Sequence, residues 1–102
     1  MNQKDFLNKI KARVLKEDAN ASLILFGSRA RGDYRADSNW DVLVLTSNEM
    51  DFKSERKLRD DIYEVELEFM QPVSTIIVEK DKWESMAITP LYENVAVQGK
   101  VL

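Results

Sequence analysis

Hydrophobic and polar positions follow one another along the chain with periods that predict an ordered series of helices and strands. Apolar side chains recur every four residues from Phe6 to Val14, which predicts an amphipathic helix over residues 3–18 with lysines on its outer side. Residues 23–26 and 42–45 are short apolar runs with the length and composition of buried strands. The first half therefore reads as a helix, a strand, a long polar connection and a second strand.

The stretch from residue 51 to residue 70 has two possible readings. Apolar residues from Leu58 to Phe69 are spaced by four, three and four positions, which favours one long helix with charges on its other face. The alternative is an alternating strand over residues 63–69. We prefer the helix because no turn residue follows Leu58, and because glutamate favours helices over strands.

The last third of the chain predicts a strand followed by two short helical segments. Pro72 precedes residues 73–78, whose composition is strongly strand-forming. Trp83 then lies in a short helical turn. A second helix is expected to begin at Pro90 and to stop at Gly99. The final two residues are expected to pack against the domain or a partner.

This order of elements predicts an α/β (α+β) fold with a small mixed β-sheet and helices packed mainly on one face. The chain has 102 residues, of which 44% are hydrophobic and 32% charged, which suits one core and one domain over residues 1–102. The open face of the sheet is expected to carry Asn39 and Asp41.

Composition excludes several kinds of chemistry. The chain contains no cysteine and no histidine, so disulfides, thiol nucleophiles, histidine-dependent triads and imidazole metal ligands are ruled out. A net charge of −3 argues against a broad basic surface for nucleic acid. No apolar run reaches membrane-spanning length and the N-terminus lacks a signal-peptide core, so the cytoplasm is the expected compartment.

The polar connection after the first strand has the composition of a phosphate-binding loop. Gly27 follows the strand directly and allows a sharp turn with close approach of the backbone to a ligand. Ser28 adds a hydroxyl donor, and Arg29 and Arg31 add positive charge and forked donors suited to phosphate. The loop is not a Walker A motif, because Gly32 is not followed by Lys-Ser/Thr.

Two candidate metal ligands stand at the start of the second strand. Asn39 and Asp41 are two positions apart, so their side chains are expected on one face of the strand, with Trp40 and Val42 on the other. Two oxygen ligands can form part of a Mg²⁺ site that water and substrate phosphates complete. The pattern therefore indicates phosphoryl or nucleotidyl transfer.

Two segments together carry a family resemblance. Residues 27–32, Gly-Ser-Arg-Ala-Arg-Gly, followed by Ser-Asn-Trp-Asp at residues 38–41 and an apolar tail, resemble the signature of the DNA polymerase β-like nucleotidyltransferase superfamily, in particular its minimal (MNT-type) members. The resemblance implies that Gly27 and Ser28 bind the phosphates of a nucleoside triphosphate, that Arg29 and Arg31 support the loop, and that Asp41 binds Mg²⁺.

The same resemblance implies how such a small domain would work. Minimal members lack a substrate-binding domain, so a separate partner is expected, either a small helical HEPN-like or substrate-binding protein or a second copy in a homodimer. The acceptor site for the transferred group would then lie on that partner.

The sequence also departs from the family pattern at the carboxylates. Asn39 stands where the family has the first aspartate of its pair. If residues 63–69 formed the next strand, Glu66 or Glu68 could supply the family's third carboxylate. If residues 73–78 form it, that position holds Ser74 or Thr75, and Glu79 is interpreted as a solvated charge.

Two functional hypotheses therefore remain open, beside a purely structural domain. In the first, the domain transfers a nucleoside monophosphate from an NTP to a hydroxyl, with Mg²⁺ on Asp41 and Asn39. In the second, it is a catalytically degenerate relative that binds a nucleotide or a partner, as the antitoxin-like half of a pair. Asn39 favours the second hypothesis, whereas the intact loop and Asp41 favour a retained ligand site.

Overall fold

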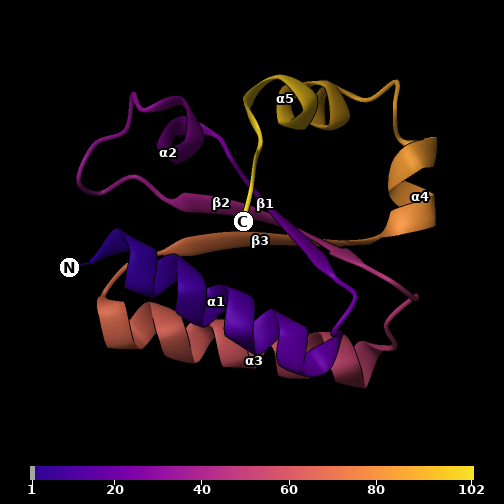
Figure 1. Ribbon diagram of the computed structural model, residues 1–102, viewed down its shortest axis with the longest axis horizontal. Coiled ribbons are helices and arrows are strands. Elements are labelled where there is room, and N and C mark those ends of the chain that lie inside the picture. Colours follow the sequence, from indigo (N-terminus) through magenta and orange to yellow (C-terminus); the bar gives the residue numbers. More distant parts are fainter. Residues whose placement is uncertain (1) are drawn as a thin grey trace.

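The computed structural model describes residues 2–102 and contains a four-stranded mixed β-sheet (Figure 1). The strands are β1 (Ser22–Phe26), β2 (Trp40–Thr46), β3 (Val73–Glu79) and β4 (Lys100–Val101). Their order in the sheet is β3-β2-β1-β4. β1 is antiparallel to both β2 and β4, whereas β2 and β3 are parallel. The central pair, β1 and β2, is the part of the sheet that positions the candidate site.

Helices cover the two faces of this sheet unequally. They are α1 (Gln3–Glu17), α2 (Ser28–Arg31), α3 (Phe52–Phe69), α4 (Lys80–Ser85) and α5 (Pro90–Gln98). The two long helices, α1 and α3, lie side by side below the sheet in Figure 1, and the shorter α4 and α5 lie on its other side. The prediction of a small mixed sheet with its two long helices on one face is confirmed, but the other face is not open as expected, because α4 and α5 pack against part of it.

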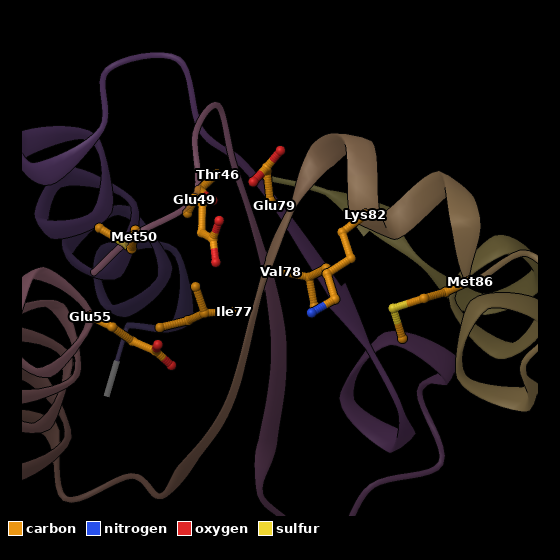
Figure 2. Close-up of a pocket in the computed structure, with 9 residues that line it drawn as sticks. All are labelled: Thr46, Glu49, Met50, Glu55, Ile77, Val78, Glu79, Lys82 and Met86. Carbon is orange, nitrogen blue, oxygen red and sulfur yellow. The ribbon is translucent and has the colours of Figure 1, made fainter. Parts of the chain in front are cut away.

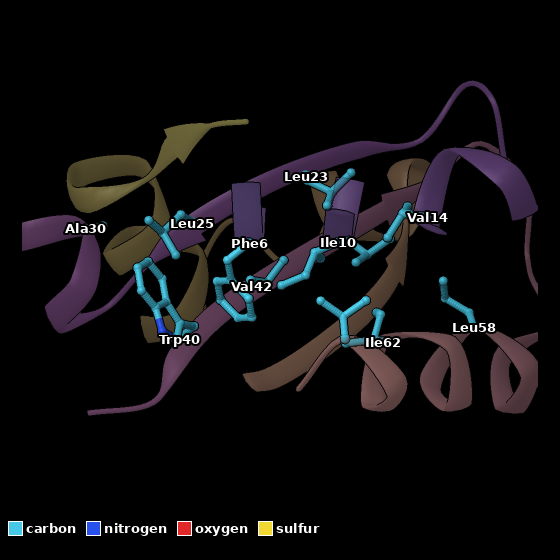
Figure 3. Packing of buried hydrophobic residues seen from close by; sticks show 12 residues of the cluster. Phe6, Ile10, Val14, Leu23, Leu25, Ala30, Trp40, Val42, Leu58 and Ile62 are labelled. Atoms are coloured by element: carbon cyan, nitrogen blue, oxygen red, sulfur yellow. The ribbon is translucent and has the colours of Figure 1, made fainter. Parts of the chain in front are cut away.

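The alternation of side chains along β2 explains the two hydrophobic clusters. Trp40, Val42 and Val44 point toward α1 and α3, where they pack with apolar residues of both helices. Figure 3 shows Trp40 and Val42 within this cluster. Leu43 and Leu45 point the other way and pack against α4 and α5. Because β2 is covered on both faces, its sequence is a continuous apolar run and does not alternate between apolar and polar residues.

The long helix predicted over residues 51–70 is present, so the alternative strand over residues 63–69 is wrong. Asp51 begins α3 by accepting a hydrogen bond from the backbone N–H of Ser54 at 2.7 Å. The helix ends at Met70, whose backbone adopts the left-handed conformation with φ of 54°. Ion pairs connect α3 with α1: Lys9 with Glu68, Arg13 with both Glu64 and Asp61, and Lys57 with Glu17.

The C-terminal third also follows the prediction, with one addition. Pro90 is the first residue of α5, Thr89 caps it, and Gly99 follows its end. The two residues of β4 then pair with β1, and the backbone N–H of Leu102 donates to the carbonyl of Leu23 at 2.9 Å. The end of the chain therefore packs against the domain's own sheet. None of the helices formed by residues 2–102 combines the length and the apolar character needed to cross a membrane.

Candidate functional site

Gly27 makes the turn from β1 into α2, and its conformation requires glycine. Its φ of 74° and ψ of −160° lie in a region that residues with a Cβ rarely adopt. A Cβ at this position would also collide with the carboxylate of Asp41 on the neighbouring strand. The turn and the carboxylate are therefore packed directly against each other, as the two halves of one site.

Asp41 is the second residue of the inner strand β2, where it is paired with Phe26 of β1 on one side and Ser74 of β3 on the other. Its neighbours Trp40 and Val42 belong to the core under α1 and α3, so the carboxylate projects from the opposite face. Burial raises the pKa of Asp41, and the positive charge of Arg31 opposes that rise. This carboxylate would gain from a cation in its vicinity, because part of its hydration has been removed.

Asn39 is joined to the third strand of the site. Its side-chain Nδ2 donates a hydrogen bond to Oγ of Ser74 at 3.1 Å. Ser74 is aligned with Asp41 in the parallel β2–β3 pair, so their side chains share a face, whereas Thr75 is aligned with Val42. Ser74, rather than Thr75, therefore stands in the place that the family resemblance assigns to the third carboxylate.

The glutamates considered as substitutes for that carboxylate lie elsewhere. Glu66 is on α3 and accepts a hydrogen bond from the backbone N–H of Val73 at 2.7 Å, which fixes the connection into β3. Glu68 pairs with Lys9 of α1 at 2.7 Å. Glu79 ends β3 opposite Thr46, at the far end of the strand from Ser74. The candidate site thus contains one carboxylate, an amide and a hydroxyl.

Arg29 is enclosed in the protein rather than extended into solvent. Its side chain is buried, and its guanidinium lies between the rings of Tyr34 and Trp40, at 4.2 and 4.4 Å from their centroids. The same group donates hydrogen bonds to the carbonyls of Ala36 and Ser38, each at 3.2 Å from Nη2. Arg29 therefore fixes the loop between α2 and β2, and it positions the residues that lead into Asn39.

Arg31 remains at the surface beside the site. Its Nε donates to a carboxylate oxygen of Asp33 at 3.2 Å, and its Nη1 donates to Oε1 of Gln98 at 3.0 Å. The bond to Gln98 connects α2 with α5, and the positive charge of Arg31 is close enough to lower the pKa of Asp41 against the effect of burial. Of the two arginines in the motif, Arg29 is buried and Arg31 is exposed.

Few oxygen donors for Mg²⁺ lie beside the turn at Gly27. Residues 2–102 contain no group of three or more acidic, histidine or cysteine side chains arranged to hold a metal. Asp41 offers a carboxylate, and Asn39 can offer its amide oxygen because its nitrogen is the atom that bonds Ser74. Mg²⁺ is commonly held by one or two carboxylates together with water and substrate phosphates. The residues therefore fit an ion that arrives with a nucleotide.

A hollow of about 490 Å³ lies at the opposite end of β2 and β3 (Figure 2). Carboxylates of Glu49, Glu55 and Glu79 line it, together with Lys82 and a floor that includes Ile77. Its excess of negative side chains opposes the binding of phosphate. The hollow is therefore a poor candidate for binding a nucleoside triphosphate, and the turn at Gly27 is the better candidate site.

Two features of the site were not predicted. The enclosure of Arg29 by Tyr34 and Trp40 depends on how the loop folds back, although the occurrence of both aromatics near the arginine was visible. The bond between Asn39 and Ser74 joins residues 35 positions apart. Only the register of β2 against β3 brings them together.

The two segments that resemble a nucleotidyltransferase signature come together in the structure as a glycine turn packed against a strand carboxylate, in a mixed sheet with a parallel β2–β3 pair. The family described as nucleotidyltransferase domain matches residues 7–101. The chain therefore belongs to the nucleotidyltransferase domain family, as the resemblance of residues 27–44 indicated.

Individual relatives agree with this assignment. The chain is 26% identical over 99 residues to the Methanocaldococcus jannaschii protein named "Putative protein adenylyltransferase MJ0604", covering 97% of this chain and 92% of that protein. Its fold resembles a toxin–antitoxin crystal structure with AMP-PNP, with a TM-score of 0.66 and 24% identity over 92% of this chain and 69% of the other. It also resembles a chain from the complex of tri-AMPylated Shewanella oneidensis HEPN toxin with MNT antitoxin, with a TM-score of 0.64 and 21% identity over 98% and 71% of the two chains.

Proposed function

We propose that this domain binds an Mg²⁺–nucleoside triphosphate at the turn between β1 and α2, and transfers the nucleoside monophosphate to a hydroxyl group of a partner protein. The observation that carries the proposal is the direct packing of Gly27 against the carboxylate of Asp41. The names of the relatives, an adenylyltransferase and an AMPylated toxin complex, favour ATP as donor and a small helical HEPN-like protein as acceptor.

Each residue of the site has a proposed task. Gly27 lets the backbone at the start of α2 approach the phosphates, Ser28 adds a hydroxyl donor, and Arg31 adds charge. Asp41 and Asn39 would hold Mg²⁺, which when bound offsets charge on the phosphates. Arg29 supports the site by holding its loop.

The transfer itself needs a proton acceptor. A new bond forms between the acceptor oxygen and the α-phosphorus, the bond from that phosphorus to the bridging oxygen breaks, and pyrophosphate leaves. The hydroxyl of the acceptor loses a proton in this step. Because Ser74 replaces a carboxylate beside Asp41, that proton would pass to water or to a group of the partner, and transfer is expected to be slow.

The bond between Asn39 and Ser74 also favours a second candidate function. Neither side chain carries a negative charge, so the site lacks the pair of carboxylates that two-metal transfer requires. Nucleotide binding does not require them. In this second function the domain is a catalytically weak module that binds a nucleotide and a partner protein, as the antitoxin-like half of a pair.

The first experiment measures ligand binding. Thermal unfolding of the wild type would be followed with ATP, GTP, CTP and UTP, each with and without Mg²⁺. We expect Mg²⁺-dependent stabilisation of about 2.7 kcal/mol at a hundred times the Kd, with loss of the response in Asp41→Asn. Asn39→Asp should be stabilised at a lower NTP concentration than the wild type. Asn48→Asp makes the same change on an exposed residue away from the site, and its response to NTP should equal that of the wild type. If no NTP stabilises either the wild type or Asn39→Asp, the proposal of nucleotide binding is wrong.

A transfer assay separates the two functions. The domain would be incubated with α-labelled NTP, Mg²⁺ and a helical partner protein, and the label on the partner would be counted. Labelling by the wild type, increased in Asn39→Asp, supports the transferase. Binding without labelling by the wild type, with labelling gained only in Asn39→Asp combined with Ser74→Asp, supports the binding module.

A further inference from the structure

Apolar side chains form an outward-facing stripe along α3 that the domain itself leaves uncovered. Phe52, Tyr63, Leu67 and Met70 are 80, 56, 57 and 81% exposed. A helix turns by about 100° per residue, so spacings of three and four positions keep such residues on one side. With two arginines between the apolar positions they form what we call the α3 seam: Phe52, Arg56, Arg59, Tyr63, Leu67 and Met70.

The α3 seam is separate from both the core and the candidate site. The core side of α3 is formed by Leu58, Ile62 and Val65, which are buried against α1 and the sheet. The carboxylate of Asp41 lies on the opposite face of that sheet. An isolated apolar residue on a surface needs no explanation, but four in one stripe over an 18-residue helix indicate an interaction surface.

We infer that the α3 seam is the interface of a twofold-symmetric dimer in which α3 packs antiparallel against α3 of a second copy. In such a pair, residues equally distant from position 61 face each other. Phe52 then faces Met70 of the second copy, and Arg56 faces Glu66 of the second copy. An apolar side chain meets an apolar one, and a positive side chain meets a negative one.

The distribution of charge along α3 supports this antiparallel arrangement. The charged side chains of the seam itself are Arg56 and Arg59 in the first half of α3, and Glu66 borders the seam in the last half. A parallel pair would place like charges opposite each other. An antiparallel pair sets Arg56 of each copy against Glu66 of the other and separates the two copies of Arg56, which favours this orientation.

The shape of the surface at one end of the seam fits the same arrangement. A hollow of about 330 Å³ is lined by Phe52, Glu55, Arg56 and Arg59. Met70 of the second copy is the flexible apolar side chain that the twofold arrangement brings to this hollow. Symmetry repeats the contact at the other end, so each copy contributes one Met70 and one hollow.

Sedimentation velocity tests whether the dimer exists. A helix of this length is roughly 27 Å long, which makes a small interface, so the concentration series should run from about 1 µM to about 1 mM. We expect a monomer–dimer equilibrium, weakened at least about tenfold by Leu67→Glu. Val97→Glu introduces the same charge at an exposed apolar residue of α5 and should leave the equilibrium unchanged. A wild type that stays monomeric throughout would overturn the proposal and leave the seam to another partner.

Cysteine cross-linking tests the antiparallel orientation of the two α3 helices. The sequence has no native cysteine, so only the introduced thiols can form a disulfide. Phe52→Cys and Met70→Cys proteins would be oxidised separately and as a mixture, then separated without reductant. We expect the mixture to give a covalent dimer and each variant alone to give much less. Equal cross-linking of each variant with itself, or cross-linking no greater than that of a Val97→Cys control, would overturn the antiparallel arrangement.

Discussion

At the scale of single residues, the site combines a backbone conformation that favours glycine with a carboxylate that has lost part of its hydration. Gly27 occupies a conformation that no other residue adopts readily, and Asp41 is packed against it with part of its hydration removed. Together they put the backbone of the turn in direct contact with the carboxylate, which is the arrangement that the proposed nucleotide site needs. Such local costs are typical of sites that bind something.

The carboxylate of Asp41 should make the domain less stable as pH rises. Burial raises the pKa of Asp41 above its unfolded value, only partly offset by Arg31, so the native state holds the proton more tightly. The free energy of unfolding therefore falls as pH rises from the ordinary pKa of aspartate through the raised one.

We expect Asp41→Asn to be more stable than the wild type at pH 7 by less than about 1 kcal/mol. The difference should disappear below the ordinary aspartate pKa. Urea unfolding without Mg²⁺ at several pH values measures it, and Asp37→Asn, on an exposed loop residue, is the control. An Asp41→Asn variant that is less stable at pH 7 would contradict this account.

The residues of the site were predictable to different degrees. Gly27, Asn39 and Asp41 follow from local sequence, because a glycine after a strand and a two-residue spacing on a strand fix conformation and face. The role of Arg29 does not follow, because a sequence shows its charge but not the two rings that enclose it. The choice of Ser74 over Thr75 requires the register of β2 and β3.

At the scale of elements, α3 ends in a way that glycine would favour. Met70 adopts the left-handed conformation, and its side chain is exposed. Replacing it by glycine removes the steric cost of a Cβ in this conformation.

We expect Met70→Gly to raise the free energy of unfolding by about 1 kcal/mol, measured by urea denaturation at protein concentrations too low for self-association. Leu67→Gly is the matched comparison, because Leu67 is an exposed apolar residue inside the same helix and should lose about 1 kcal/mol. Equal destabilisation by both substitutions would show that the helix terminus does not favour glycine.

The elements that sequence patterns predicted are the long or clearly bounded ones. α1 and α3 show several turns of apolar periodicity, and α5 is bounded by Pro90 and Gly99. α2 has four residues and β4 has two, so neither is long enough to display a period. β4 forms by pairing with the edge of β1, so its presence depends on residues far away in the sequence and not on its own pattern.

At the scale of the whole molecule, one carboxylate joins two connections that are distant in the sequence. Asp18, after α1, accepts hydrogen bonds from the backbone N–H of Ser47 at 2.7 Å and from its hydroxyl at 2.8 Å, beyond the end of β2. Burial raises the pKa of Asp18, but these bonds, with one from the N–H of Asn20 and the charge of Lys80, lower it overall.

The contribution of Asp18 to stability should therefore depend on pH in the opposite sense to that of Asp41. A lowered pKa means that the stabilisation is present above the ordinary aspartate pKa and is lost as pH falls through the lowered one. We expect Asp18→Asn to lose about 1 kcal/mol at neutral pH and to approach the wild type in acid, as followed by urea unfolding. Ser47→Ala should cost a similar amount, and the double variant should cost less than the two losses added together. Full additivity would show that the two residues act independently.

The enclosure of Arg29 has a consequence for the kinetics and thermodynamics of any ligand at the neighbouring turn. Its contacts with Tyr34, Trp40 and the carbonyls of the loop are made entirely within the protein, so the loop is already ordered before a ligand arrives. Binding then requires little loss of conformational entropy in this segment. The site is a preorganised one, in which the free energy of the contacts is available for affinity rather than for folding a loop.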